Sequence, residues 1–317
     1  MNSNDEQSGS PDPNQNPYSP TDHGQAGQTD AALSDELVHG MQSREYEIGD
    51  ILSVSFNLFR QNFVDLGVPG LIFGLVTLVV TVLASSVSAG WMMSMMQVSG
   101  TGEPDPMAML SSISEYAPLF LIMALGSLAL QAMLAAYTVL RTQACARSGG
   151  QKPEIGVTVQ EALGVLPLYI GVSVVSVIIV GIGFMLCFLP GIYAAVILAL
   201  TGPLVAIAKA GFGSITQSIE LVKGRFVKTL VSLVAVGLAF YVVIILISLI
   251  IGNPAEEQMR IMMEGAGGDP TAALQDYITS PAYIAMQLPG TLIGGLMYSM
   301  LSVLSTVMYF NYSRPNQ

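Results

Sequence analysis

Long apolar stretches alternate with short polar segments along this chain. Six stretches contain no Asp, Glu, Lys or Arg, and they cover about residues 66–90, 116–140, 168–189, 190–208, 229–251 and 283–311. A helix rises about 1.5 Å per residue, so about 20 residues cross a hydrocarbon core of about 30 Å. Each stretch is long enough to cross, or nearly so. The pattern therefore predicts an all-α, polytopic membrane bundle of six transmembrane helices.

The boundary between the third and fourth spans rests on two residues. Residues 168–208 form one apolar run, which is too long for a single crossing, and Pro190 and Gly191 lie near its middle. Proline removes a backbone donor and glycine permits a reversal of the chain. We expect a tight hairpin turn at Pro190 and Gly191, with a kinked, re-entrant pair of helices as the alternative.

Two amphipathic segments precede spans. In residues 46–63 one stripe holds Leu52, Phe56, Phe59 and Phe63, and the other face holds Ser53, Asn57, Arg60 and Gln61. In the second segment the apolar stripe holds Ile215, Ile219, Val222 and Phe226. Helices of this kind lie flat at the headgroup level of a membrane.

A shift of 163 residues superposes the two stripes and pairs Ser55 with Ser218. We interpret this as an internal repeat of an interfacial helix followed by a two-span hairpin. Residues 157–166, before the third span, are a candidate for a third and more degraded copy. The chain thus has two or three expected interfacial helices.

The first 43 residues differ from the rest in composition. They are rich in Asn, Ser, Gln, Pro, Gly and Asp and contain no Lys or Arg. Such a segment buries too little apolar area to offset the entropy of ordering. We expect a disordered, polar and acidic tail over residues 1–43 and a membrane domain over residues 44–314.

Composition and charge support a membrane setting and predict an orientation. The chain is 52% hydrophobic and 10% charged, against about 25% charged residues in soluble proteins. The net charge is −11, and no basic patch with interleaved aromatics suggests nucleic acid as a partner. Ten of the eleven basic residues fall before, between or after the spans on one side of the predicted bundle. Because cytoplasmic loops collect Lys and Arg, we expect a multi-pass protein of the cell membrane, in a bacterium the inner membrane, with both termini cytoplasmic.

Candidate functional residues fall into two groups. Basic residues beside a surface helix attract anionic lipid, and the candidates for headgroup contact are Arg60, Lys223, Arg225 and Lys228. Small residues one turn apart let two helices approach closely in lipid, and the candidates for helix packing are Gly70, Gly74, Gly290 and Gly294.

Polar side chains inside the spans are few. Gln131 and Gln287 are the main ones, and we expect each to hydrogen-bond a neighbouring helix. We find no catalytic constellation and no metal or cofactor motif. The leading hypothesis is a non-enzymatic scaffold or accessory subunit that acts at lipid headgroups beside an unidentified partner protein. The alternatives are a transporter or permease component, which the internal repeat favours, and a lipid-modifying enzyme.

Four short motifs resemble a known membrane domain. Residues 48–52 and 59–63 resemble its opening interfacial helix, residues 189–193 its central Pro-Gly turn, and residues 218–226 the segment before its fifth span. The family is the six-span membrane domain of some bacterial glycerophosphoryl diester phosphodiesterases, with uncharacterised stand-alone relatives. The similarity covers about residues 46–312. In those enzymes the chemistry belongs to a separate metal-binding barrel, so the resemblance implies an architecture and no catalytic residue here. It adds the membrane half of a phosphodiesterase system to the alternative of a lipid-modifying enzyme.

Overall fold

The computed structural model describes residues 46–99, 106–147, 152–264 and 270–313, and helices make up nearly all of this part of the chain, which contains no strand. The helices are α2 (Ile48–Gln61), α3 (Phe63–Ser99), α4 (Pro106–Arg147), α5 (Ile155–Leu186), α6 (Phe188–Ile197), α7 (Thr201–Ala206), α8 (Gly213–Lys223), α9 (Phe226–Ile251), α10 (Pro254–Glu264), α11 (Pro270–Ile278) and α12 (Pro281–Tyr312). The predicted tail, residues 1–43, lies outside the described residues.

Six helical segments are long and apolar enough to cross a membrane. They are Phe63–Trp91, Ile113–Ala146, Ile155–Leu186, Phe188–Ala206, Phe226–Ile251 and Pro281–Tyr312. The prediction of an all-α bundle with six candidate membrane spans is therefore confirmed. Two spans are most exposed, since only 6% of the most apolar window of Phe226–Ile251 and 11% of that of Ile155–Leu186 are buried within the protein.

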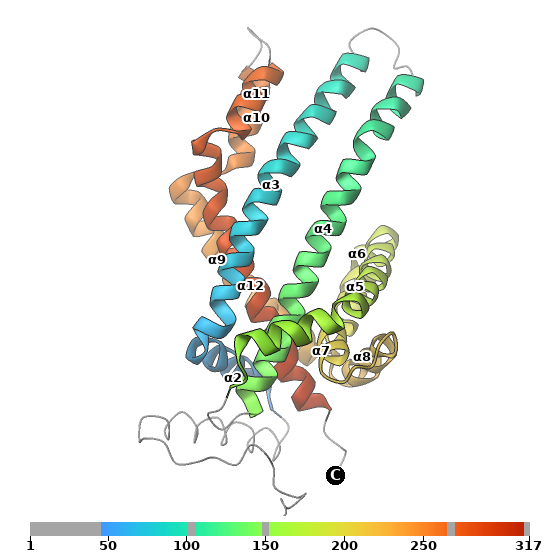
Figure 1. Ribbon diagram of the computed structural model, residues 1–317, viewed down its shortest axis with the longest axis vertical. Helices are drawn as coiled ribbons and strands as arrows, with labels where there is room; N and C mark the ends of the chain where they lie inside the picture. The colour runs from blue at the N-terminus through green and yellow to red at the C-terminus, as the bar shows by residue number, and fades with distance from the viewer. Residues whose placement is uncertain (1–45, 100–105, 148–151, 265–269, 314–317) are drawn as a thin grey trace, which may run out of the picture.

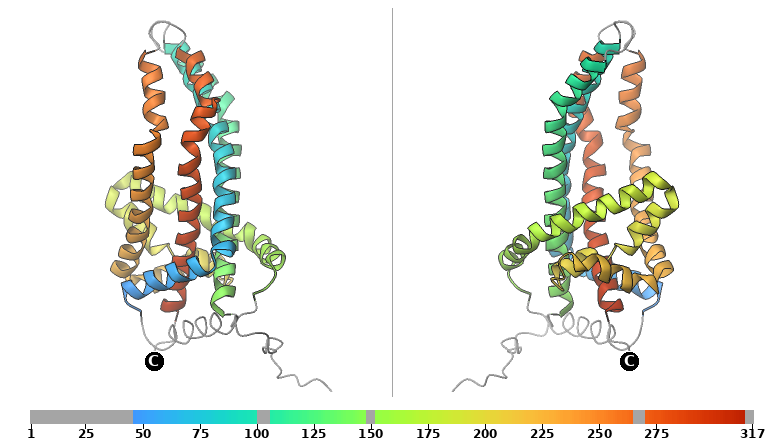
Figure 2. Two further views of the ribbon diagram at one scale, coloured as in Figure 1. Left: turned by 90° about the vertical axis from the view of Figure 1, so that its left-hand side faces the viewer. Right: turned by 90° about the vertical axis from the view of Figure 1, so that its right-hand side faces the viewer.

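Helix α12 forms the centre of the bundle. It packs against α2, α3, α4 and α9, and Figure 2 shows it between α9 on one side and the α3–α4 pair on the other. The bundle has two ends (Figure 1). We call the end with α2, α8 and the C-terminus of α12 the proximal end, and the end with α10 and α11 the distal end. The described chain begins and finishes at the proximal end, where the amide of Tyr46 donates to Asn311 Oδ1 at 3.1 Å.

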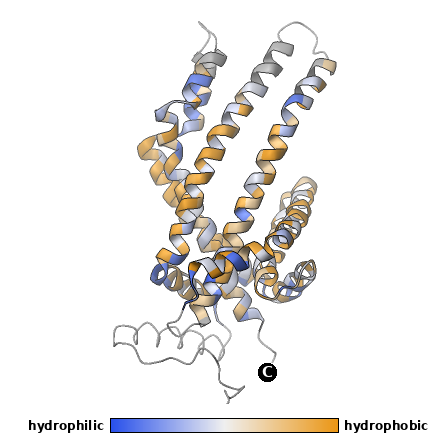
Figure 3. Cartoon of the chain, in the orientation of Figure 1, coloured by the Kyte–Doolittle hydropathy of each residue, from blue (hydrophilic) through white to orange (hydrophobic). Residues whose placement is uncertain are grey.

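Helices α3 and α4 extend well past the other spans toward the distal end (Figure 1). They have 37 and 42 residues, which corresponds to about 55 and 63 Å of helix. Figure 3 shows apolar residues along the middle of these helices and along α9, whereas α10 and α11 carry more hydrophilic residues. A hydrocarbon core of about 30 Å covers only part of α3 and α4, so their distal ends project beyond it.

The distal helices α10 and α11 do not follow from the hydropathy pattern. Glu256 and Glu257 lie in the first turn of α10, where the helix dipole favours negative charge. Arg260 pairs with Glu257 one turn later, and the hydrogen bond from its guanidinium holds the pKa of Glu257 below its ordinary value. The hydroxyl of Tyr283 then lies 2.8 Å from Ser85 Oγ, which ties this end of α12 to α3. Gln287 Nε2 donates to the same hydroxyl at 3.0 Å.

The α5–α6 hairpin corrects the expected place of the turn. Helix α5 ends at Leu186, Cys187 is extended with φ −172° and ψ 157°, and α6 begins at Phe188. Pro190 lies in the first turn of α6, where its missing donor costs no helical hydrogen bond. A Cβ on Gly183 would lie 3.0 Å from the Cα of Gly191. Gly191 therefore provides the close approach of the two helices, and the reversal itself is at Cys187.

Close packing of α3 on α12 depends on three glycines. A Cβ on Gly70 would lie 2.7 Å from the carbonyl oxygen of Gly295, and one on Gly74 would lie 2.6 Å from that of Thr291. In contrast, a Cβ on Gly290 or Gly294 would meet no heavy atom within 4 Å. The predicted glycines of α3 thus lie at the helix contact, but the glycine of α12 that meets them is Gly295, one residue further along.

Candidate functional site

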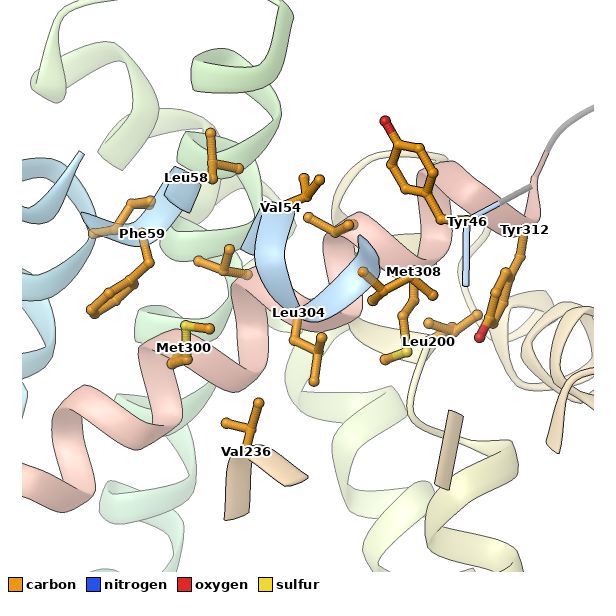
Figure 4. Packing of buried hydrophobic residues seen from close by; sticks show 14 of the residues in the cluster. Tyr46, Val54, Leu58, Phe59, Leu200, Val236, Met300, Leu304, Met308 and Tyr312 are labelled. Atoms are coloured by element: carbon orange, nitrogen blue, oxygen red, sulfur yellow. The ribbon is translucent and has the colours of Figure 1, made fainter. Parts of the chain in front are cut away.

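Helix α2 lies across the proximal end and runs crosswise to the spans (Figure 2). Its buried residues are Ile51, Val54, Ser55, Leu58 and Phe59. Figure 4 shows the cluster that this face forms with Met300, Leu304 and Met308 of α12. An interfacial position for α2 requires that its opposite side remain available to lipid.

The aromatic stripe predicted for α2 is divided between two faces. Phe59 is buried, whereas Phe56 and Phe63 are 58% and 40% exposed. Helix α2 packs against α12, α9, α3 and α4 with the side that holds Phe59 and leaves Phe56 on the other side. Arg60 lies one turn after Phe56 and is also exposed. The outer side of α2 therefore presents Phe56 one turn from Arg60, and the exposed Phe63 follows at the start of α3.

Helix α8 is the second proximal helix, and one serine attaches it to the spans. Ser218 Oγ donates to the carbonyl of Ile197 at 2.7 Å and accepts from the amide of Leu200 at 3.3 Å. These two backbone groups lie at the break between α6 and α7, inside the candidate span Phe188–Ala206. Since open backbone groups are costly in hydrocarbon, Ser218 stabilises a broken span. Phe212, directly before α8, is 58% exposed, and Lys223, the last residue of α8, is also exposed.

The third candidate interfacial segment is part of α5. Thr158 and Ala162 are buried one turn apart, at positions that correspond to Ser214 and Ser218 of α8 after a shift of 56 residues. Pro167 lies inside the helix, and the first turns of α5 run in a direction different from that of the rest (Figures 1 and 2). Proline is a common cause of such kinks. The segment is therefore continuous with its span rather than a separate helix.

The four predicted headgroup residues separate into two pairs. Arg60 and Lys223 are exposed and make no hydrogen bond or ion pair with another residue of the described ranges. Arg225 lies 5.0 Å from the centre of the Tyr312 ring, and Lys228 Nζ donates to the carbonyl of Tyr46 at 3.0 Å. The second pair thus helps to hold the two ends of the described chain together at the proximal end.

An ionic cluster at the proximal end, in which Arg141 is buried and Lys152 is exposed, does not follow from the hydropathy pattern. Asp65, in the first turn of α3, accepts from Arg141 Nη2 at 2.6 Å and from Lys152 Nζ at 2.9 Å. Arg141 also donates to the carbonyl of Pro153 at 2.5 Å, and Lys152 donates to Asn62 Oδ1 at 2.5 Å. The Arg141 side chain is 5% exposed. The cluster joins the proximal ends of α3 and α4 to the start of α5.

A signal for this cluster was present in the sequence. Asp65 directly precedes the first apolar stretch, and Arg141 directly follows the second. In an antiparallel pair of spans these two positions come to the same level of the bilayer. An acid and a base at matched ends of neighbouring spans therefore indicate an ion pair, which removes Arg141 and Lys152 from the set of cations available to lipid.

The described residues contain no group of three His, Cys, Asp or Glu side chains that could hold a metal ion. No family model, curated protein or solved structure matches this chain. The resemblance to the phosphodiesterase membrane domain therefore stays a prediction. The candidate functional site is the outer side of the proximal end and has two parts: Phe56, Arg60 and Phe63 at α2 and the start of α3, and Phe212 and Lys223 at the two ends of α8. We call these five residues the headgroup surface.

Proposed function

We propose that this chain is a non-enzymatic membrane scaffold or accessory subunit that gathers anionic lipid headgroups at its proximal end. One observation carries the proposal: α2 and α8 lie across the ends of the spans, and cations of both helices are exposed together with Phe56 of α2 and the adjoining Phe63 and Phe212. Phenyl rings at this level enter the boundary between headgroups and acyl chains, and Lys or Arg at the surface attracts anionic lipid.

The placement in the cell follows from the same charges. The proximal end carries Arg60 and Lys223, and basic ends of membrane proteins face the cytoplasm. We propose a multi-pass protein of the bacterial inner membrane with this end toward the cytoplasm. A scaffold of this kind would act with a soluble or membrane protein partner.

Lipid retention tests the proposal. The double variant Arg60→Gln and Lys223→Gln should lower the preference for phosphatidylglycerol over phosphatidylcholine. Each basic residue near an anionic surface contributes about 1 kcal/mol, so the loss of two should reduce the preference by about thirtyfold at most. Native mass spectrometry of the protein released from mixed-lipid nanodiscs measures the retained lipids.

The control variant is Arg260→Gln, which removes a cation from α10 at the distal end and should leave the preference unchanged. Arg225 and Lys228 are left intact, because their contacts with Tyr312 and Tyr46 make a loss of folding a competing explanation. An unchanged preference in the double variant would contradict the proposal.

Two other functions remain as alternatives. The internal repeat of interfacial helices favours a transporter or permease component, and substrate-dependent flux into liposomes would support it. A lipid-modifying enzyme would be supported if the purified chain had phosphodiesterase activity that a chelator removes.

A further inference from the structure

A polar cavity lies within the bundle, apart from the headgroup surface. Its volume is about 240 Å³, and it lies between α4, α5, α7 and α12. Gln131, on its wall, precedes Arg141 by ten residues on α4, a rise of about 15 Å from the proximal ionic cluster. That depth is near the middle of a hydrocarbon core of about 30 Å. The polar lining residues are Gln131, Tyr169, Ser173, Ser176, Thr201, Tyr298 and Ser305.

Three of these side chains have unused hydrogen-bonding groups. Tyr169 is 9% exposed, and its hydroxyl makes no hydrogen bond to any residue in the described part of the chain. Ser176 Oγ is buried and likewise has no partner among the described residues. Gln131 was expected to bond a neighbouring helix, but it bonds none within the described ranges and lines the cavity instead. Thr201, by contrast, already donates to the carbonyl of Leu198 at 2.8 Å.

The side chains that line the cavity indicate which chemical groups its ligand carries. Polar groups without partners are costly inside an apolar bundle, so three of them around one cavity indicate a ligand that supplies both donors and acceptors. The lining contains no Asp, Glu, Lys, Arg or His. A charged ligand at this depth would need a partner of opposite charge. The ligand group is therefore neutral and bears hydroxyls.

The side on which the cavity opens indicates that its ligand comes from the membrane. Val177 lines the cavity and is 62% exposed on α5, in a span of which only 11% of the most apolar window is buried. The cavity thus opens on the side of the bundle that faces acyl chains. Its volume is below the range of about 300–1,000 Å³ of sites that enclose a whole small molecule. It suits the head of an amphiphile whose tail stays in the bilayer.

We propose that this cavity binds the neutral, hydroxyl-bearing head of a single-chain membrane amphiphile, such as a monoacylglycerol or a long-chain alcohol. Tyr169, Gln131 and Ser176 hydrogen-bond the head, and the tail leaves past Val177. Gly202 keeps the site open, because a Cβ there would lie 2.5 Å from the Tyr169 hydroxyl. The inference goes beyond the proposed function, since it concerns a different surface and a neutral lipid.

Photolabelling of the full chain in nanodiscs tests the site. The probe is a long-chain alcohol that carries a diazirine near its hydroxyl, and mass spectrometry identifies the labelled peptides. We expect labelling of the peptides that hold residues 128–132 and 169–177, and competition by unlabelled monoacylglycerol. The variant Tyr169→Phe with Ser176→Ala removes two hydrogen-bonding groups and should reduce this labelling about tenfold.

The matched control is Tyr241→Phe, which removes the same hydroxyl from an exposed position of α9 and should leave labelling unchanged. Thermal unfolding of each variant in detergent shows whether the fold is intact, and Gly202→Val offers a second way to fill the site. Equal labelling by the matched alkane or carboxylate probe would overturn the proposal. So would undiminished labelling in the double variant, or competition by free glycerol as strong as that by monoacylglycerol. None of these results depends on Arg60 or Lys223. The proposal that the proximal end binds anionic headgroups is therefore tested independently of the proposal for this cavity.

Discussion

At the scale of single residues, one repeat position has acquired two different roles. Ser55 and Ser218 correspond after the shift of 163 residues, and both are fully buried. Ser55 Oγ donates to the carbonyl of Ile51 in its own helix at 2.7 Å. Ser218 instead bonds two backbone groups of another segment, at the break between α6 and α7. The sequence shows the equivalence of the two serines, but the difference between them depends on which backbone lies opposite.

This difference predicts unequal costs for the same substitution. Ser218→Ala should lower the free energy of unfolding by about 1–3 kcal/mol, because two backbone groups inside a span lose their partner. Ser55→Ala should change it by less than about 0.5 kcal/mol, since the carbonyl of Ile51 keeps its bond within the helix. Unfolding in detergent with increasing SDS measures both values, and equal losses would contradict the role assigned to Ser218.

At the scale of helices, hydropathy located each span, but it did not show how the span is oriented about its own axis. The packing of α3 on α12 illustrates this point. Gly290 and Gly294 have the spacing of a packing motif, yet Gly295 lies at the contact. Adjacent residues of a helix are about 100° apart around the axis, so an error of one residue selects a different face.

A pair of neighbouring glycines tests the contact. Gly295→Ala would place a Cβ 2.0 Å from the carbonyl oxygen of Gly70. The two helices would have to separate, and we expect a loss of about 1–3 kcal/mol in the free energy of unfolding. Gly294→Ala has open space and should be neutral or stabilise the helix by up to about 1 kcal/mol. SDS unfolding of the two variants in the same detergent measures the difference, and a smaller loss for Gly295→Ala would refute this packing.

At the scale of the whole molecule, an even number of spans brings the two ends of the described chain together. Tyr46 and Asn311 are hydrogen-bonded, and Lys228 and Arg225 contact the same two ends through Tyr46 and Tyr312. The ionic cluster of Asp65, Arg141 and Lys152 joins three more elements at this level. The proximal end is thus the part of the bundle where the most distant segments of the chain meet.

Reporter fusions test the arrangement of the ends. A reporter that is active only in the cytoplasm, fused before residue 1 in one protein and after residue 317 in another, should be active in both. The reason is that six spans return the chain to its starting side and that basic loops stay in the cytoplasm. Activity at one end alone would require an odd number of crossings and would reject the six-span topology.

Local pattern alone was sufficient to recognise lipid as the surrounding solvent, to find six candidate spans, and to place the amphipathic helices before them. These properties depend on the length and composition of continuous segments, which a sequence displays directly. Folding in three dimensions set the buried face of α2, the reversal at Cys187, the contact at Gly295, the pairing of Asp65 with Arg141, and the cavity around Tyr169. Each of these depends on which residues from distant segments face one another, and helical periodicity within one segment does not specify its rotation or its neighbours.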